Sequence, residues 1–584
     1  MLDIVVDNDT LDVTVRISIP LHGDKEITFE KVYRDGDEEG NNCDKVRCFD
    51  KEMFDLAIFP SYRLPDNNAY NIMLGTQKID DLQLKFYRIA DLPSNADIKD
   101  VTDDVRTVDK DFKTRHLHIS GDFDFIEIAV PEKGTEYHAL IIPRFKQCPD
   151  QTKDFSFCVD FGTTNTHVAY ASKTIGSNND ITLAQVKTFE ILDNDKQLLT
   201  LHDDGGPGYF MKFPTALNRE FVPSKIQKDT IHYPMRTTTL EKITAAGNMK
   251  CFSSTNIGFY YDNELIKDSS SQGIYRTNIK WAKKDPLAQT RLEEYFKELL
   301  WLMKGKTALN EGGCNFKVVA TYPLSMSVPE VQIFKNAWKT AAKWLSLSEK
   351  SIKFELESVA PYYTLQTGDK HKYGEPYMNL DIGGGTTDIL HVRPLAGGKD
   401  ESSVFSALFA ANDLWGDGVD VASDKLENGF IDFYKQSEAY KILSEIKKAE
   451  IGSVLNKEDL SSADFISYLF THDNDINDPF RFSQAIASST EMMRIVITHF
   501  TSLIYYVAII LDTAELKIPR LINFTGMGSK YIKLISDDDA TLGLLISKIF
   551  SYYGKLVGND ELIGTKVAVN FEKEPKLVTA QGCL

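Results

Sequence analysis

The chain has 584 residues, 42% of them hydrophobic and 26% charged, and this composition supports at least two folded domains, each with its own core. The formal net charge of -19 repels phosphate backbones and anionic lipid, and no stripe of Lys or Arg offsets it, so we expect neither nucleic acid nor membrane as a partner. Acidic residues in the opening MLDIVVDNDTLDV argue against a signal peptide and predict a cytoplasmic protein. The longest apolar run, LIYYVAIIL at residues 503–511, is too short to cross a bilayer and predicts a buried helix.

Residues 1–147 are predicted to form a β-rich, sandwich-like domain. In LDVTVRISI the apolar residues alternate strictly from Leu11 to Ile19, and LQLKFYRI repeats the alternation from Leu82 to Phe86, as expected for half-buried strands. Turn-rich pieces such as RDGDEEGNN and LPDNNAYN separate such runs. The following KQCPDQTK, residues 146–153, is interpreted as a linker.

Beyond this linker, strands and helices alternate, which predicts an α/β architecture. The most clearly marked helix follows the short apolar strand FKVVATYP. Ser327 and Glu330 have capping-box spacing, and Pro329 stands in the first turn. Apolar residues then recur on one helical face from Val331 to Leu345. The predicted unit is therefore strand, loop and helix.

Two segments of this second part nearly repeat each other. They are CVDFGTTNTHVAYA, which begins at Cys158, and NLDIGGGTTDILHV, which begins at Asn379. Each consists of an apolar strand, an aspartate (Asp160 or Asp381), a glycine-containing turn with two threonines, and a second strand. The repetition predicts a duplicated half-domain.

The composition of these two turns indicates phosphate binding. A glycine-rich turn lets backbone N–H groups converge, and threonine hydroxyls add donors without adding charge. The aspartates alone would repel phosphate, so their presence predicts a divalent cation, Mg²⁺, held partly through water. Two turns and one metal predict a clamp for a nucleoside triphosphate. For either segment alone, the alternative is a tight hairpin, in which Gly and Thr are also common.

These segments resemble motifs of the superfamily that joins actin, the DnaK-type heat-shock chaperones and the sugar kinases, and the resemblance covers residues 154–584. VDFGTTNT resembles the first phosphate motif and LDIGGGTTD the second, both in forms near those of DnaK. INFTGMGSKYIKLI, residues 522–535, resembles the adenosine motif. In that motif Gly526, Gly528 and Ser529 would pack against base and ribose, although Met527 interrupts the more common double glycine.

Four further segments occur in the order of this superfamily. KVVATYP is similar to the strand before the first connecting helix, and ELESVAPYYTLQTGD to the connecting segment, with Glu357 at its acidic position. LWGDGVD resembles a chaperone loop that would bring Gly416 near the phosphates. SEIKKAEIGS keeps Glu445 and Lys448 three positions apart, as the chaperone does beside adenosine. Such a pair is also typical of a solvated helix face.

The resemblance implies an actin-like ATPase with two lobes, residues 154–376 and 377–584, built as duplicated ribonuclease-H-like halves that close over Mg-ATP. It implies phosphate contacts from Gly162, Thr163, Thr164, Asn165, Gly383, Gly384, Gly385, Thr386 and Thr387, with Thr163 and Thr386 at the γ-phosphate. It implies that Asp160 and Asp381 hold the hydrated metal and that Glu357, Asp381 and Asp388 position the attacking water. Lys280 in YRTNIKWAKKDP would be the phosphate-contacting lysine, although a surface position is the alternative and Lys283 and Lys284 have equal claims.

The function implied is slow ATP hydrolysis coupled to rotation of the lobes. Because the resemblance reaches the C-terminus, we expect no peptide-binding domain after it, and the N-terminal β domain would instead recognise a protein partner. The first hypothesis is therefore a DnaK-like, nucleotide-dependent switch, which the acidic Glu357 favours over eukaryotic actin with its glutamine. The alternatives are an actin-like ATPase that polymerises into filaments, a small-molecule kinase, and a nucleotide-binding scaffold with little hydrolysis.

Overall fold

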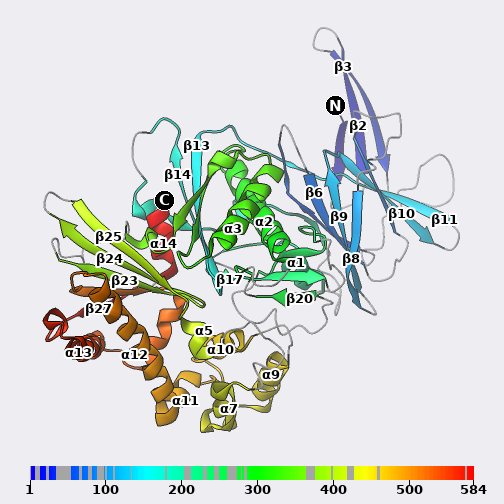
Figure 1. Cartoon of the computed structure of the whole chain (residues 1–584). Helices are drawn as coiled ribbons and strands as arrows, with labels where there is room; N and C mark the ends of the chain where they lie inside the picture. The colour runs from blue at the N-terminus through cyan, green and yellow to red at the C-terminus, as the bar shows by residue number, and fades with distance from the viewer. Residues whose placement is uncertain are drawn as a thin grey trace.

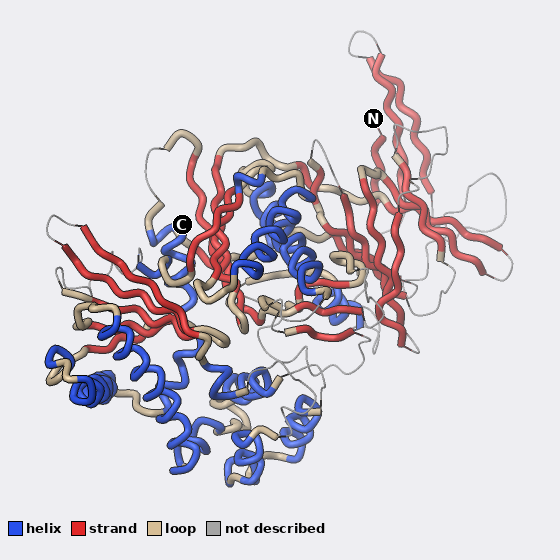
Figure 2. Tube along the Cα trace, in the orientation of Figure 1, coloured by secondary structure: helices blue, strands red, loops and turns tan. Residues whose placement is uncertain are grey.

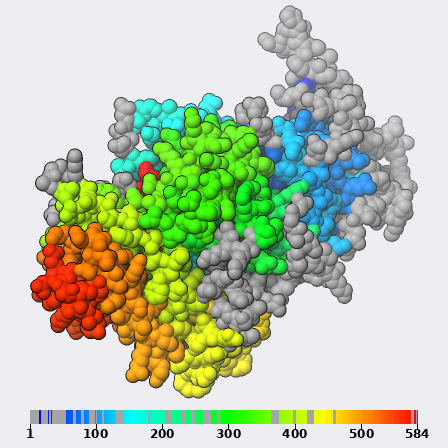
Figure 3. Space-filling model, in the orientation of Figure 1, coloured from blue at the N-terminus to red at the C-terminus, as the bar shows by residue number. Residues whose placement is uncertain are grey.

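The computed structural model describes residues 2–6, 13–21, 25–33, 54–64, 69–76, 82–88, 98, 101–109, 112–132, 135–177, 181–202, 212–227, 233–242, 249–259, 273–277, 279–281, 286–362, 375–395, 399–416, 427–456, 461–572 and 575–584. These residues form a mixed α/β protein with several sheets (Figures 1 and 2), which confirms the predicted α/β class. The N-terminal strands lie at the opposite end of the molecule from helix α13 (Asp539–Val557), as the blue and red ends of the space-filling view show (Figure 3).

The N-terminal part contains a small projecting sheet and a two-sheet sandwich. Strands β1 (Leu2–Val6), β2 (Val13–Leu21) and β3 (Lys25–Tyr33) form the antiparallel sheet that stands away from the body in Figure 1. β2 contains the predicted alternating strand from Val13 onward, and Leu11 lies outside the described residues. The sandwich follows it along the chain.

The sandwich consists of a five-stranded sheet facing a three-stranded sheet. The larger sheet has the order β16 (Leu199–Leu201), β4 (Phe54–Phe59), β6 (Ala69–Thr76), β9 (Phe112–Ser120) and β8 (Val101–Asp109), and the smaller has the order β11 (Thr135–Ile141), β10 (Phe125–Glu132) and β7 (Gln83–Tyr87). Ile72 of the larger sheet and Phe86 and Ile126 of the smaller share one buried core. This is the sandwich-like packing expected for residues 1–147.

The opposite face of the five-stranded sheet is also buried, against the part of the chain that follows. Phe59, Met73 and Phe112 belong to the same core as Phe157 and Trp301. The expected linker contains β12 (Lys146–Gln147), which pairs with β5 (Tyr62–Arg63), and the start of the next strand at Lys153. The edge strand β16 comes from beyond the expected boundary at residue 147 and pairs with β4. The N-terminal part therefore shares a core and strand pairings with the following part of the chain and is not joined to it by a free linker.

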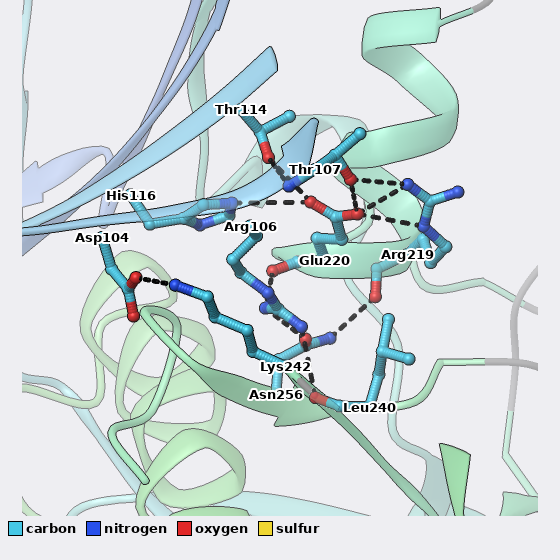
Figure 4. A network of polar contacts seen from close by, with 10 residues as sticks. All are labelled: Asp104, Arg106, Thr107, Thr114, His116, Arg219, Glu220, Leu240, Lys242 and Asn256. Atoms are coloured by element: carbon cyan, nitrogen blue, oxygen red, sulfur yellow. Dashed lines mark hydrogen bonds and ion pairs between the residues drawn. The ribbon is translucent and has the colours of Figure 1, made fainter. Parts of the chain in front are cut away.

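A buried polar network reinforces this junction (Figure 4). The carboxylate of Glu220, at the end of α1 (Lys212–Glu220), accepts hydrogen bonds from Thr107 and, at 2.9 Å, from Thr114 Oγ1. Arg219 Nη2 lies 2.6 Å from Glu220 Oε1. Arg106 Nη1 of strand β8 donates to the backbone oxygen of Glu220 at 2.7 Å. Strands of the N-terminal sheet are thereby fixed to α1.

The charges in this network shift two pKa values. Burial opposes ionisation of Glu220, but His116, Arg219 and Arg106 together hold its pKa far below the usual range. His116 Nε2 lies 3.7 Å from Glu220 Oε2. Burial lowers the pKa of His116, and the charge of Arg106 lowers it further although Glu220 opposes this. The network therefore holds a neutral imidazole beside an ionised carboxylate at neutral pH.

The first central sheet lies in the middle of the molecule. Its order is β15 (Lys187–Thr188), β14 (Asn165–Thr174), β13 (Lys153–Phe161), β21 (Lys317–Tyr322) and β22 (Ile352–Leu356). β14 runs antiparallel to β13 and to β15, whereas β21 is parallel to both β13 and β22. Helices α2 (Ala288–Leu309) and α3 (Val328–Trp344) lie on it. Between β16 and α2 lie α1 and the short strands β17 (Met235–Arg236), β18 (Thr239–Lys242), β19 (Thr255–Ile257) and β20 (Gly273–Arg276).

Helix α3 is the helix predicted from its cap. Ser327 is the N-cap, its backbone N–H donates to Glu330 Oε2 at 2.8 Å, and a proline stands in the first turn. Phe334, Trp338 and Ala341 are buried on one face. The predicted capping box and apolar face are confirmed.

The second central sheet repeats the topology of the first. Its order is β25 (Lys399–Ala407), β24 (Thr387–Leu395), β23 (Tyr377–Ile382), β26 (Leu521–Thr525) and β27 (Ala568–Phe571). β24 is antiparallel to β23 and β25, and β26 is parallel to β23 and β27. Both sheets place the first strand of their half in the centre, with an antiparallel hairpin on one side and two parallel strands on the other.

Helices make up most of the rest of the second half. They are α5 (Ala411–Trp415), α7 (Gly429–Gln436), α8 (Glu438–Lys441), α9 (Glu445–Leu455), α10 (Ser462–Thr471), α11 (Phe482–Ser488), α12 (Thr490–Thr513), α13 and α14 (Pro575–Cys583). The predicted buried helix at residues 503–511 is part of α12, where Leu503, Ile504 and Val507 are buried. Of the described helices, α12 has the length and mean hydropathy, 1.8, of a membrane span, and half of its most apolar window is buried inside the protein. α14 returns to the first sheet, where Ala580 packs against Cys158 and Ala169.

Candidate functional site

The two glycine-threonine segments form the hairpin turns of the two central sheets. The first turn joins β13, which ends at Phe161, to β14, and the second joins β23 to β24. The N–H of Gly162 donates to Asn165 O at 3.1 Å, and the N–H of Gly383 donates to Thr386 O at 2.8 Å. The hairpin geometry left open by sequence is thus present in both turns, and each closes in the same way.

The two turns touch each other. A Cβ atom added to Gly384 would lie 2.0 Å from Thr164 Oγ1 and 3.1 Å from Asn412 Oδ1, so glycine is required there by close approach. The indole Nε1 of Trp281 donates to Thr163 Oγ1 at 2.9 Å. The N–H of Asn412 donates to Gly384 O at 2.8 Å. Segments more than 200 residues apart in the sequence therefore form one surface.

A cleft of about 820 Å³ opens over this surface between the two halves, a size typical of small-molecule sites. The predicted site residues that line it are Gly162, Thr163, Thr164, Asn165, Lys280, Glu357, Asp381, Gly383, Gly384, Thr386, Asp388 and Gly528. They come from the two hairpin turns with their strands, from the segments around Lys280 and Glu357, and from the 3-10 helix Met527–Leu534. The structure thus brings most of the predicted residues together.

The lining includes a buried ion pair and two neighbouring aspartates. Lys280 Nζ lies 2.6 Å from Glu357 Oε1, and both side chains are buried. Asp381 and Asp388 are opposite each other in the register of β23 and β24. Burial raises the pKa of Asp388 to about 8, and the charges of Glu357 and Asp381 add to the rise, although Lys280 opposes it. Thr579 Oγ1 of α14 donates to Asp381 Oδ2 at 3.3 Å. The charges of Glu357 and Asp381 therefore both act on the carboxyl group of Asp388.

The segment that resembles the adenosine motif packs against the second turn. Gly526 has a φ of 79° and precedes the 3-10 helix Met527–Leu534. A Cβ atom on Gly526 would lie 2.3 Å from Ile382 O and 2.4 Å from Asp381 Oδ1. Ser529 Oγ donates to Gly526 O at 2.7 Å and is buried, so its hydroxyl stabilises the turn. Gly528 is the predicted residue of this motif that reaches the cleft.

Several predicted residues lie within two positions of the lining without forming part of it. They are Asp160, Gly385, Thr387, Gly416, Gly526 and Ser529. Asp160 is 1% exposed and its backbone oxygen accepts the N–H of Gly162 at 3.2 Å. Thr387 Oγ1 donates to Phe409 O at 2.7 Å. Gly416 ends α5 with a φ of 125°. Residues 417–420 of the LWGDGVD segment, and Lys283 and Lys284, lie outside the described residues.

Glu445 and Lys448 are not brought to the cleft. They lie on α9, Lys448 Nζ is 2.8 Å from Glu445 Oε1, and the Glu445 side chain is 88% exposed. This is the solvated helix face that was the alternative for the pair. The next helix, α10, lines the cleft instead through Ile466 and Phe470. The spacing of an acid and a lysine does not reveal which of two successive helices faces inward.

Sequence reasoning missed several lining residues. Trp415 lies beside Phe470 at a ring-centroid distance of 5.5 Å and forms an apolar wall. Lys530 and Lys533 follow Gly528 in the 3-10 helix and add positive charge to the lining. Two lysines three positions apart, shortly after a glycine, were the sequence feature that could have indicated them. Arg236, which also lines the cleft, follows no motif in the sequence.

No protein-family model matches the chain, and no curated protein matches it. The function is therefore inferred from the geometry of the cleft and from the motifs in its turns.

Proposed function

We propose that this chain binds and hydrolyses Mg-ATP as a DnaK-like member of the actin, DnaK and sugar-kinase superfamily and acts as a nucleotide-dependent switch on a protein partner. The observation that carries the proposal is the contact of two Gly-Thr hairpin turns from two sheets that share the same order of five strands. Duplicated ribonuclease-H-like halves that close over a nucleotide would produce this arrangement. The seven motif-like segments in family order support the same proposal.

The donor set of the cleft fits a magnesium-bound triphosphate. Backbone N–H groups and the hydroxyls of Thr163 and Thr386 offer uncharged donors for phosphate oxygens. The carboxyl groups of Asp381, Asp388 and Glu357 offer the oxygen ligands that Mg²⁺ takes directly or through water. The raised pKa of Asp388, to about 8, reflects burial among like charges, and a cation in their midst would relieve that repulsion.

Each residue then has a role in hydrolysis. Asp381 would hold the metal through its water shell, and bound Mg²⁺ would neutralise charge on the phosphate oxygens. Glu357, held in place by Lys280 at 2.6 Å, would orient the attacking water. Once a bound cation had lowered its pKa, the Asp388 carboxylate would accept or share the proton of that water. Thr163 and Thr386 would fix the terminal phosphate so that attack occurs in line.

The N-terminal sandwich would carry the partner-binding function. Its packing on the first half through Phe59, Met73 and Phe112, together with the Glu220 network (Figure 4), would make it move with that half. Rotation of one half against the other would then displace the N-terminal sheets relative to the second half. A partner that contacts both would respond to the bound nucleotide.

Self-assembly is a second candidate, favoured by one surface. Helix α13 exposes Leu544, Tyr552 and Leu556. Leu544 and Tyr552 line a groove of about 1070 Å³ between α13 and the start of β27, with Lys548 and Lys566 also in its lining. An exposed apolar surface of this kind is typical of a contact with another protein chain. Head-to-tail contacts that do not close would give a filament.

Phosphate release and sedimentation test both candidates. The intact chain is incubated with Mg-ATP, Mg-ADP or no nucleotide, beside the variants Asp381→Asn in the cleft and Asp432→Asn on the exposed face of α7. We expect slow phosphate release from wild type and Asp432→Asn, and loss of most of it in Asp381→Asn. ATP-dependent growth of the sedimenting species would favour the filament. Equal release from all three proteins would refute the assigned site.

A further inference from the structure

Arg236 lies beside the first turn, on a short strand that pairs with β14. It forms β17 with Met235, and β17 pairs antiparallel with β14 so that Arg236 is opposite Asn165. Opposed residues of an antiparallel pair point to the same face of a sheet. Asn165 and Arg236 accordingly both line the cleft, whereas Met235 is buried in the core of the first half.

The backbone next to Arg236 is fixed to the first turn. The N–H of Thr237 donates to Thr164 O at 2.9 Å, and Thr237 Oγ1 donates to Gly162 O at 2.7 Å. Thr237 Oγ1 also lies 2.8 Å from Thr166 Oγ1. Because both ends of the turn are tied to Thr237, Arg236 keeps a constant position relative to the residues expected to hold phosphate.

One side of the guanidinium is held by the opposite half of the protein. Arg236 Nη2 lies 2.5 Å from Asp464 Oδ1, and both side chains are more than nine-tenths buried. Asp464 is fixed in turn by the capping box of α10, in which Ser461 Oγ donates to Asp464 Oδ2 at 2.8 Å. This ion pair crosses from β17 of the first half to α10 of the second.

The other terminal nitrogen of the guanidinium is an unpaired donor among the described residues. Arg236 Nη1 is buried and has no hydrogen-bond partner within the described part of the chain. An unpaired buried donor costs free energy, and a guanidinium presents its N–H groups as a fork that matches phosphate. The cleft that Arg236 lines also contains the two Gly-Thr turns. A phosphate group in that cleft would satisfy Nη1.

We propose that Arg236 is a phosphate-contacting residue that makes the site prefer nucleoside triphosphate over diphosphate. The proposal rests on the proposed nucleotide site and adds to it a specificity determinant that no motif contained. Nη1 would donate to the terminal phosphate beside Thr163, while Nη2 keeps Asp464. Because Asp464 belongs to the other half, the contact would also make closure of the halves depend on the terminal phosphate.

The test compares the affinities for two nucleotides. Dissociation constants of Mg-ADP and of a non-hydrolysable Mg-ATP analogue are measured by calorimetry for wild type, Arg236→Lys and Arg236→Ala. Arg291→Lys is the matched control, because Arg291 is a buried arginine of the same half that pairs with Glu241 and lies outside the cleft lining. We expect Arg236→Ala to weaken the triphosphate analogue by about tenfold or more and the diphosphate by much less, which corresponds to one charge-assisted contact.

Arg236→Lys keeps the charge that Asp464 needs, so it tests the proposal even if Arg236→Ala does not fold. It should keep the unfolding midpoint near wild type and still lose part of the preference for triphosphate, because a lysine has no fork to divide between two acceptors. An equal loss of affinity for both nucleotides would indicate a purely structural ion pair and would overturn the proposal. Unchanged affinities of Arg236→Ala for both nucleotides would also overturn it. If wild type binds neither nucleotide, the proposed function itself is wrong. The measurement on wild type therefore separates failure of the proposed function from failure of the role proposed for Arg236.

Discussion

Lys280 Nζ lies 2.6 Å from Glu357 Oε1, and both side chains are buried in the wall of the cleft. The two residues are 77 positions apart, on either side of α2 and α3. Removing one member of a buried ion pair leaves the other charge without compensation. The pair therefore stabilises the first half and also fixes the positions of two proposed site residues.

The first prediction concerns this pair. Glu357→Ala should lower the free energy of unfolding by about 3 kcal/mol because it leaves Lys280 charged and buried. Urea unfolding followed by circular dichroism measures the effect. The control is Glu438→Ala, which breaks the exposed Lys441–Glu438 pair, with side chains 59% and 83% exposed, and should change stability by less than about 0.5 kcal/mol. Similar losses in both variants would contradict the burial of the Lys280–Glu357 pair.

The second prediction concerns the contact of the two turns. Gly384→Ala places a Cβ atom where Thr164 Oγ1 lies 2.0 Å away, so it should destabilise the protein by about 2 kcal/mol. Adding Thr164→Ala should recover part of this loss, because the two substitutions then share one space. Thermal unfolding of the two single variants and the double variant measures the coupling.

Gly452→Ala is the control for the effect of alanine itself. Gly452 lies in α9, and no atom of the described residues lies within 4 Å of an added Cβ, so the substitution should stabilise the helix slightly. Strict additivity of Gly384→Ala and Thr164→Ala would mean that the two turns do not touch.

The third prediction concerns pH and the Glu220 network. The pKa of Glu220 is far below its usual 4.5, so its contribution to stability is present above about pH 4.5 and is lost as the pH falls toward the folded pKa. The pKa of His116 is below its usual 6.5, so the unfolded chain takes up a proton first as the pH falls below about 6.5, and stability decreases there too. Both groups predict acid destabilisation.

Unfolding midpoints between pH 7.5 and 4 would show this dependence. We expect His116→Gln to flatten the curve between about pH 6.5 and 5 and Glu220→Gln to lower stability most at neutral pH. A wild-type protein that becomes more stable as the pH falls from 7 to 5 would contradict the neutral, buried state of His116.

The fourth prediction concerns the N-terminal part. Deleting residues 1–147 would remove β4, the partner of β16, and expose core residues that pack against Phe59 and Phe112. The remaining chain should aggregate or melt well below the intact protein. Deleting residues 1–33, which contain the separate sheet β1–β3, should be much milder. Equal stability of the intact chain and the residue 148–584 chain would show that the N-terminal part is an independent domain.

Much of the fold was predictable because its signals are local. The capping box at Ser327 and Glu330 and the alternation from Leu82 to Phe86 correspond to α3 and to a strand of the sandwich. The near repeat around Asp160 and Asp381 corresponds to two sheets of the same topology. Short-range periodicity and turn chemistry are sufficient for such elements.

The rest depended on contacts between distant segments. Nothing in the sequence indicates that residues 199–201 complete the N-terminal sheet, because a short edge strand has no pattern of its own. Nor does the spacing of Glu445 and Lys448 reveal that α10, rather than α9, lines the cleft. Arg236 was missed because its position depends on the contact with Asp464, which is more than 200 residues away in the sequence.

The central claim is that both turns hold one nucleotide. Calorimetric titration of the intact chain with a non-hydrolysable Mg-ATP analogue, with and without Mg²⁺, tests it most directly, using Gly384→Ala and Asp381→Asn beside the surface variant Asp432→Asn. We expect one nucleotide per chain, a requirement for Mg²⁺, and strong weakening in both cleft variants while Asp432→Asn binds like wild type. Absence of binding to wild type, or equal affinity in all four proteins, would contradict it.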